Sequence, residues 1–81
     1  MPAVFRYKGY RFFFYSNEGD PREPLHIHVV KADKVAKFWL ESEVSVAESY
    51  GMTSAELKML AQVVDERRDL INEVWNEYFS A

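Results

Sequence analysis

The pattern of hydrophobic and polar residues predicts two β-hairpins and one further strand in the N-terminal part of the chain. Lys8-Gly9 separates two aromatic-rich runs, and a two-residue linker that ends in glycine is typical of a tight hairpin turn. Ala32-Asp33 makes a second tight turn between two further apolar runs. The expected strands cover residues 4–7, 10–15, 26–31, 35–40 and, with a weaker pattern, 44–50.

The C-terminal part predicts one long amphipathic helix. Thr53 and Glu56 have the spacing of a capping box, in which each side chain bonds a backbone N–H at the helix start. Neither proline nor glycine follows, so the helix is expected to run through residue 79, about seven turns. Arg68 lies within the apolar stripe, where its stem can pack while its charged head reaches the edge. The stripe consists of Leu57, Leu60, Ala61, Val64, Ile71, Trp75 and Tyr78.

Together these elements predict an α+β fold. A single domain over residues 1–81 would hold an antiparallel sheet of four to five strands, covered on one face by the long C-terminal helix. Side chains alternate between the two faces of a strand, so the tight turns fix which residues share a face. The face expected under the helix carries Phe5, Tyr7, Tyr10, Phe12, Phe14, Ile27, Val29, Ala36 and Phe38.

The opposite face of the sheet, called the outer face below, is expected to be basic and aromatic. Arg6 lies opposite Arg11 in the first hairpin, and two facing cations are unfavourable unless an anion is near. We therefore expect the ligand to bind on this face. Its predicted binding residues are Arg6, Arg11, Tyr15, His26, His28, Lys37 and Trp39, with Phe13 beside them.

His26 and His28 lie on the same face of one strand, where two imidazoles could share a metal ion or transfer protons. Two nitrogen ligands do not complete a zinc site. A third ligand would have to come from a carboxylate in the following set: Glu18, Asp20 and Glu23. Nothing in the spacing requires this arrangement, so we expect no structural metal and no cofactor.

Composition removes several further classes of site. The chain has no cysteine, which excludes disulfides, thiolate zinc sites and cysteine nucleophiles. No segment reaches the roughly 18 to 20 apolar residues of a membrane span, and no apolar core of a secretion signal is present, so a cytoplasmic protein is expected. Residues 1–39 hold seven Lys or Arg and four Asp or Glu, a net charge of +3, whereas residues 40–81 hold three and nine, a net charge of −6. This asymmetry fits either an anion-binding face or an acidic, solvated helix.

The predicted helix carries more apolar surface than one sheet face needs. Its apolar arc is widened by Met59, Val63, Leu70 and Val74, beyond the roughly 100° that one contact requires. A homodimer or a stable complex with a small protein partner is therefore expected, because exposed apolar surface of this extent marks a contact site.

Three segments of the chain are similar to one protein family. The segments GYRFFFYSNEGDPREPLHIHV, AKFWL and ERRDLINEVWNEYF resemble the bacterial domain-of-unknown-function family numbered 4160, over nearly the whole chain. Leu25 stands where many relatives have a second proline. The resemblance implies a bacterial or archaeal cytoplasmic protein and supplies no catalytic residues. Members are often encoded beside another small uncharacterised protein, which implies a paired, toxin–antitoxin-like setting.

Two functions from different classes stay open. The leading hypothesis is a non-enzymatic module that binds a small protein partner through the outer face or through the apolar flank of the helix. The alternative is a small RNA-acting toxin or nuclease, in which aromatic rings stack on bases and His26 or His28 transfers protons. In that case Arg6, Arg11 and Lys37 would hold phosphate.

Overall fold

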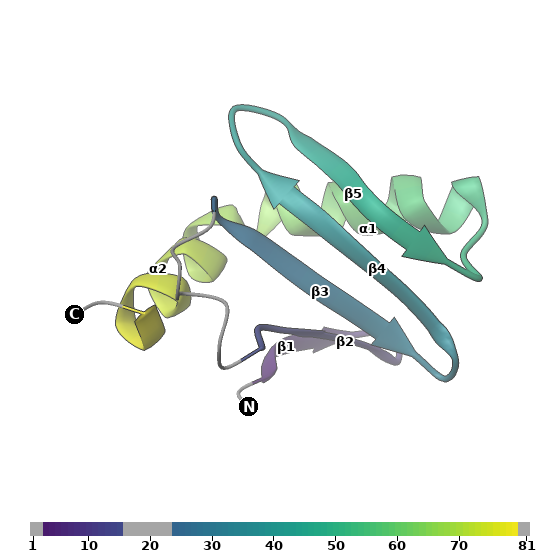
Figure 1. Ribbon diagram of the computed structural model, residues 1–81, viewed down its shortest axis with the longest axis horizontal. Helices are drawn as coiled ribbons and strands as arrows, with labels where there is room; N and C mark the ends of the chain where they lie inside the picture. Colours follow the sequence, from purple (N-terminus) through teal and green to yellow (C-terminus); the bar gives the residue numbers. More distant parts are fainter. Residues whose placement is uncertain (1–2, 16–23, 80–81) are drawn as a thin grey trace.

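Within the described part of the chain, five strands form one antiparallel sheet, and two helices follow it (Figure 1). The computed structural model describes residues 3–15 and 24–79. The strands are hydrogen-bonded in chain order, each to the next, so the sheet is a simple meander. This arrangement confirms the predicted α+β fold. The elements are β1 Ala3–Tyr7, β2 Tyr10–Phe13, β3 His26–Lys31, β4 Lys34–Leu40, β5 Val44–Tyr50, α1 Ser54–Glu66 and α2 Arg68–Phe79.

Both predicted hairpin turns are present, and they set the register. Lys8 and Gly9 have φ angles of 49° and 83°, the left-handed conformation that tight hairpin turns require. Ala32 adopts φ 55° in the second turn. The pairings that follow are those expected from the sequence: Phe5 with Phe12, Arg6 with Arg11, Tyr7 with Tyr10, His26 with Trp39, Ile27 with Phe38, His28 with Lys37 and Val29 with Ala36.

The predicted inner face of the sheet forms the core. Phe12, Phe14 and Phe38 are fully buried, and the rings of Phe5 and Phe12 stack at 4.2 Å. β2 ends at Phe13, two residues before its expected end, yet Phe14 still packs inward. The core contains Tyr10, Phe12, Phe14, Ile27, Val29, Ala36, Phe38, Leu40, Leu60, Val63, Val64, Ile71 and Trp75.

The prediction of one unbroken helix is wrong, because the chain bends at Arg67 and forms α1 and α2 instead. Arg67 has φ −106° and ψ 18°, and its N–H is shared between the carbonyls of Val63 and Val64. A straight helix over residues 54–79 would be roughly 39 Å long, whereas a seven-residue strand spans only about 23 Å. The bend instead brings Ile71 and Trp75 of α2 back onto the core, at the end of the sheet where β3 begins (Figure 1).

The bend also accounts for most of the apolar surface that seemed to exceed one core. Val63 is buried, and Met59 and Val74 are half-buried against the core. Of the four flank residues, Leu70 is the exposed one, at 38%. Of the six large apolar side chains that are exposed in the described residues, the helices carry two, Leu70 and Tyr78, and the other four lie on or beside the sheet.

Arg68 reaches the edge of its stripe as predicted. Its guanidinium donates a hydrogen bond to the Glu41 carbonyl in the β4–β5 turn, with an N–O distance of 2.5 Å. It also forms an ion pair with Asp65 at 2.8 Å. Arg68 thus ties the start of α2 to the sheet, which is a structural role.

Candidate functional site

Three rows of side chains cross the outer face, perpendicular to the strands. The pairing of neighbouring strands determines which residues belong to each row. The row nearest the tight turns carries Arg6, Arg11, Val30, Val35 and Tyr50; the middle row carries Phe13, His28, Lys37 and Glu48; the third carries His26, Trp39 and Ser45.

Rings and cations on the outer face contact one another in a continuous series. The Arg11 guanidinium lies over the Phe13 ring, 5.1 Å from its centroid, and the Phe13 ring stacks on His28 at 5.6 Å. Tyr15 meets His28 edge-on at 4.6 Å. Phe13 is only 5% exposed, while Tyr15 is 45% exposed. Phe13 therefore supports the surface from below, and Tyr15 contributes a partly exposed ring to it.

His26 keeps its predicted register but is fully buried, whereas the sequence pattern predicts that it points outward to solvent. The rings of Trp39 and Trp75 lie 5.4 and 5.2 Å from the His26 ring, because α2 closes over this end of the sheet. His26 Nδ1 lies 2.8 Å from the Pro24 carbonyl oxygen. A carbonyl can only accept, so Nδ1 carries a proton.

Lys37 and Trp39 lie together on β4. The Lys37 ammonium is 4.5 Å from the centroid of the Trp39 ring, a cation–π contact. Across the strands, Lys37 pairs with His28 on one side and Glu48 on the other. Both Lys37 and His28 are half-buried, so they form the floor of the outer face.

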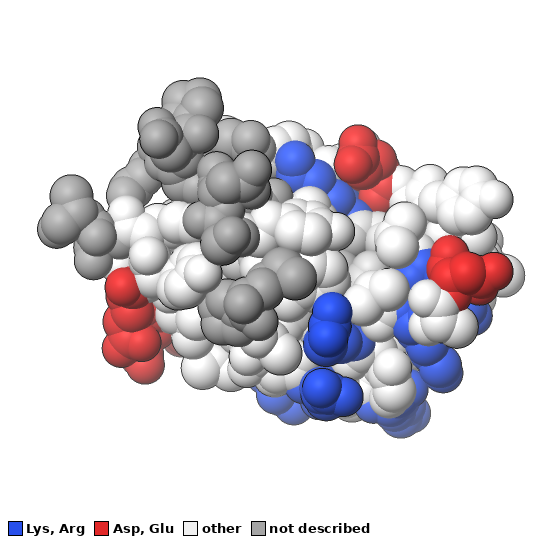
Figure 2. All heavy atoms as spheres, turned by 60° about the horizontal axis from the view of Figure 1, so that its bottom comes forward, with Lys and Arg blue, Asp and Glu red and all other residues white. Residues whose placement is uncertain are grey.

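Arg6 and Arg11 are opposite one another as predicted, Arg6 exposed and Arg11 half-buried. Within residues 3–15 and 24–79, neither guanidinium has a carboxylate partner, and Arg11 Nε is buried without a hydrogen bond. Lys8 and Lys31 lie at the same end, joined by a bond from the Lys31 ammonium to the Lys8 carbonyl. Figure 2 shows Lys and Arg side chains gathered over the end where the two tight turns lie.

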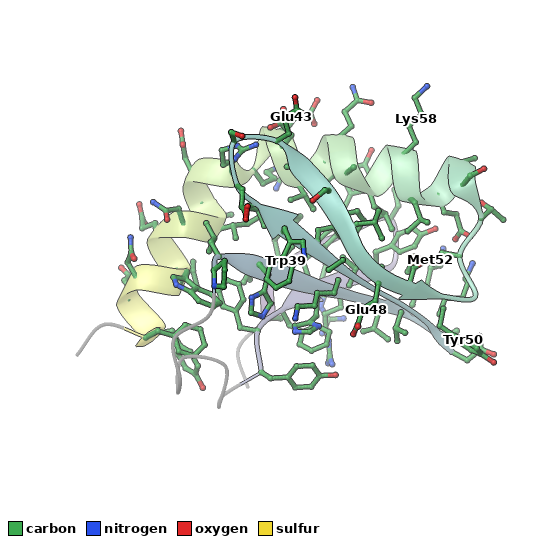
Figure 3. The ribbon with its side chains drawn as sticks, turned by 45° about the horizontal axis from the view of Figure 1, so that its top comes forward. Trp39, Glu43, Glu48, Tyr50, Met52 and Lys58 are labelled. Carbon is green, nitrogen blue, oxygen red and sulfur yellow. The ribbon has the colours of Figure 1, made fainter. Side chains whose placement is uncertain are left out.

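A pocket opens on the outer face beside this cationic end. It has a volume of about 250 Å³ and lies between the exposed rings of Tyr15 and Tyr50. Figure 3 shows Glu48 and Tyr50 on β5, extending away from α1, whereas Lys58 points outward from the far side of α1. The lining residues are Tyr15, His28, Val35, Ala36, Lys37, Glu48, Ser49 and Tyr50.

Glu48 and Tyr50 are site residues that the sequence pattern misses. Counting forward from the β4–β5 turn, strict alternation would place Glu48 and Tyr50 on the inner face, with Val44 and Val46. The register instead shifts between Lys37 and Phe38: Lys37 pairs with Glu48, but Phe38 pairs with Val46. This bulge inserts one extra residue into β5 and reverses which face the following side chains occupy. No residue in β5 marks a bulge in advance, so alternation alone could not find it.

The described residues do not assemble a metal centre. Among them, no three His, Asp or Glu side chains are grouped closely enough to hold an ion. The carboxylates considered as a third ligand, Glu18, Asp20 and Glu23, lie outside the described residues. The helices of the described chain also include none that is long and apolar enough to cross a membrane.

One comparison with known proteins is informative. A family model described as "Domain of unknown function (DUF4160)" matches residues 9–76, which include β2 to β5, all of α1 and most of α2. No curated protein and no solved structure matches the chain significantly.

Proposed function

The chain belongs to this family of domains of unknown function, and we propose that it is a binding module whose outer face holds an acidic segment of a small protein partner. A partner encoded beside it, in the paired setting that the resemblance implies, is one source of such a segment. The proposal assigns no catalytic step to the protein.

The Arg6–Arg11 pair is the observation that carries the proposal. Two cations directly opposite across strands are destabilising by some tenths of a kcal/mol to about 1 kcal/mol. Within the described residues no carboxylate offsets this cost. A carboxylate from a partner would bind both guanidinium groups through charge-assisted hydrogen bonds, which are the stronger kind.

Charge and burial favour an acidic protein segment over RNA. An RNA strand carries a phosphate charge at every nucleotide and meets the chain's net charge of −3 along its whole length, whereas a peptide segment can present one or two carboxylates to the arginine pair. Glu48 lies in the middle row of the outer face, where a phosphate backbone would meet a like charge. A nuclease that used His26 for proton transfer would need that imidazole at the surface, but His26 is fully buried.

The experiment that tests this proposal offers the protein two probes. A random peptide display library and a fluorescent polyuridine oligonucleotide are presented to the wild-type protein and to an Arg6→Ala, Arg11→Ala double variant. We expect the wild type to select peptides rich in Asp and Glu, and the double variant to bind a selected peptide about tenfold or more weakly. Lys58→Ala is the matched control, since it removes an exposed cation on the far side of α1 and should leave binding unchanged.

Three outcomes would overturn the proposal. One is selection of peptides without acidic residues, and another is a double variant that is folded by circular dichroism and binds the selected peptides as the wild type does. The third is a protein that selects no peptide but binds the oligonucleotide, with affinity that falls steeply as salt rises. That last result would support an RNA-binding function instead.

A further inference from the structure

We infer that the pocket between Tyr15 and Tyr50 receives one aromatic side chain of the bound segment and thereby selects the partner. The inference rests on the proposed function, because it assumes that a protein segment occupies the outer face. It adds the identity of the side chain that anchors this segment and its spacing from the acidic group.

Size limits what the pocket can hold. Its volume of about 250 Å³ is below the roughly 300 to 1,000 Å³ of sites that enclose drug-sized ligands or cofactors. A single large side chain, entering from a partner that covers the opening, is a ligand of matching size. The pocket is therefore suited to an interface anchor rather than to a metabolite.

The walls are apolar and exposed. Tyr50 is 72% exposed, Tyr15 45% and Val35 44%. These three account for half of the six large hydrophobic side chains that are exposed in the described residues, and all three line this same pocket. Exposed apolar groups gathered at one place mark a contact site, whereas scattered ones do not.

Polar groups at the pocket favour an aromatic anchor that has a hydrogen-bonding tip. Lys37 and Glu48 both line the pocket with the apolar walls, and the Glu48 carboxylate can accept a hydrogen bond there. Tyr and Trp combine a large ring with one polar group, and they are enriched among the residues that dominate interface energies. The ring of such a residue would pack between Tyr15 and Tyr50.

The pocket and the arginine pair lie a fixed distance apart on the sheet. Arg11 on β2 and Val35 on β4 belong to the same row and are separated by β3. Two strand spacings amount to roughly 10 Å, which an extended peptide covers in about three residues. The partner segment should therefore carry its acidic residue about three positions from its aromatic anchor if it binds in extended form.

Parallel selections from the same peptide library test the inference. On the wild type we expect peptides that combine acidic residues with one Tyr or Trp. On Tyr50→Ala we expect acidic peptides without a fixed aromatic position, because the pocket loses a wall. Tyr50→Phe keeps the ring and should restore the aromatic preference. Tyr78→Ala removes a similarly exposed ring from α2 and should select the same peptides as the wild type.

Affinities of one synthetic peptide then measure the contact directly. Replacing its aromatic residue by alanine should weaken binding to the wild type about tenfold. The same replacement should have little effect on binding to Tyr50→Ala, because both changes remove one contact. Independent effects of the two replacements would place the anchor elsewhere and overturn the inference.

The selections separate failure of this inference from failure of the proposed function. Acidic peptides with no aromatic preference would overturn the pocket assignment while the function of the outer face stands. Selection of no acidic peptide would overturn both. Tyr50 is largely exposed, so its variants are expected to fold, and circular dichroism checks this before selection.

Discussion

At the scale of single residues, Glu56 joins the sheet to the start of α1. Its Oε2 accepts hydrogen bonds from the Tyr10 hydroxyl and the Lys34 ammonium, both at 2.7 Å. Its Oε1 accepts the Thr53 backbone N–H at 2.9 Å, which completes the capping box. These bonds, that of Lys34 first and then those of Tyr10 and Thr53, lower the pKa of Glu56 from 4.5 to about 2. Spacing predicts the capping box, but only the fold brings Tyr10 and Lys34 to the same carboxylate.

Glu56→Gln should therefore lower the stability of the protein at neutral pH, and the stability of the variant should change less as the pH falls. A carboxyl whose folded pKa is depressed stabilises the protein above its unfolded pKa, near 4.5, and this contribution is lost as the pH falls toward 2. Glutamine can still cap the helix, but its amide NH2 cannot accept a hydrogen bond from the Lys34 ammonium, so the variant removes the charge and that bond together. Melting temperatures by circular dichroism should differ most at neutral pH and converge as the pH falls through the folded pKa, about 2. A constant difference over the acid range would show that the charge of Glu56 is not responsible.

At the scale of elements, the hydrophobic pattern predicts the strands, their pairing and the helix start, but it misses two irregularities. The bend at Arg67 has no glycine or proline to announce it, because it arises from the mismatch between a long helix and a short sheet. The bulge between β4 and β5 likewise depends on packing rather than on a local signal. Each irregularity changes which residues are buried or share a face. Six of the seven predicted binding residues are exposed or half-buried, and His26 alone among them is enclosed. The six are Arg6, Arg11, Tyr15, His28, Lys37 and Trp39.

Thr53→Ala tests how much the capping box contributes to α1. The Thr53 hydroxyl accepts the Glu56 backbone N–H at 3.1 Å, and alanine leaves this donor without its partner. We expect the free energy of unfolding to fall by about 0.5 to 2 kcal/mol, whereas Thr53→Ser, which keeps the hydroxyl, should change it little. Urea titration followed by circular dichroism measures both. Equal stability of the alanine and serine variants would mean that the cap is not stabilising.

At the scale of the whole molecule, α2 connects the core to the outer face. Trp75 is 4% exposed, and its ring lies 5.1 Å from Phe14 in the core and 5.2 Å from His26. His26 in turn contacts His28 and Trp39, which belong to the outer face. The C-terminal helix therefore positions the binding surface indirectly, through packed rings, although it lies at the end of the sheet.

Trp75→Ala should consequently affect stability and binding together. Truncating a buried tryptophan costs about 3 to 5 kcal/mol, a large share of the roughly 4 to 12 kcal/mol expected for 81 residues. The variant should unfold at much lower urea concentration and bind an acidic peptide weakly. Trp75→Phe retains a ring beside Phe14 and His26, so it should remain folded. Weaker peptide binding by this folded variant would show that the contact between Trp75 and His26 positions the outer face. Tyr78→Ala, on the exposed side of α2, should change stability by about 0.5 kcal/mol or less. A Trp75→Ala protein with wild-type stability would show that α2 does not hold the sheet, and that the outer face is organised by the strands alone.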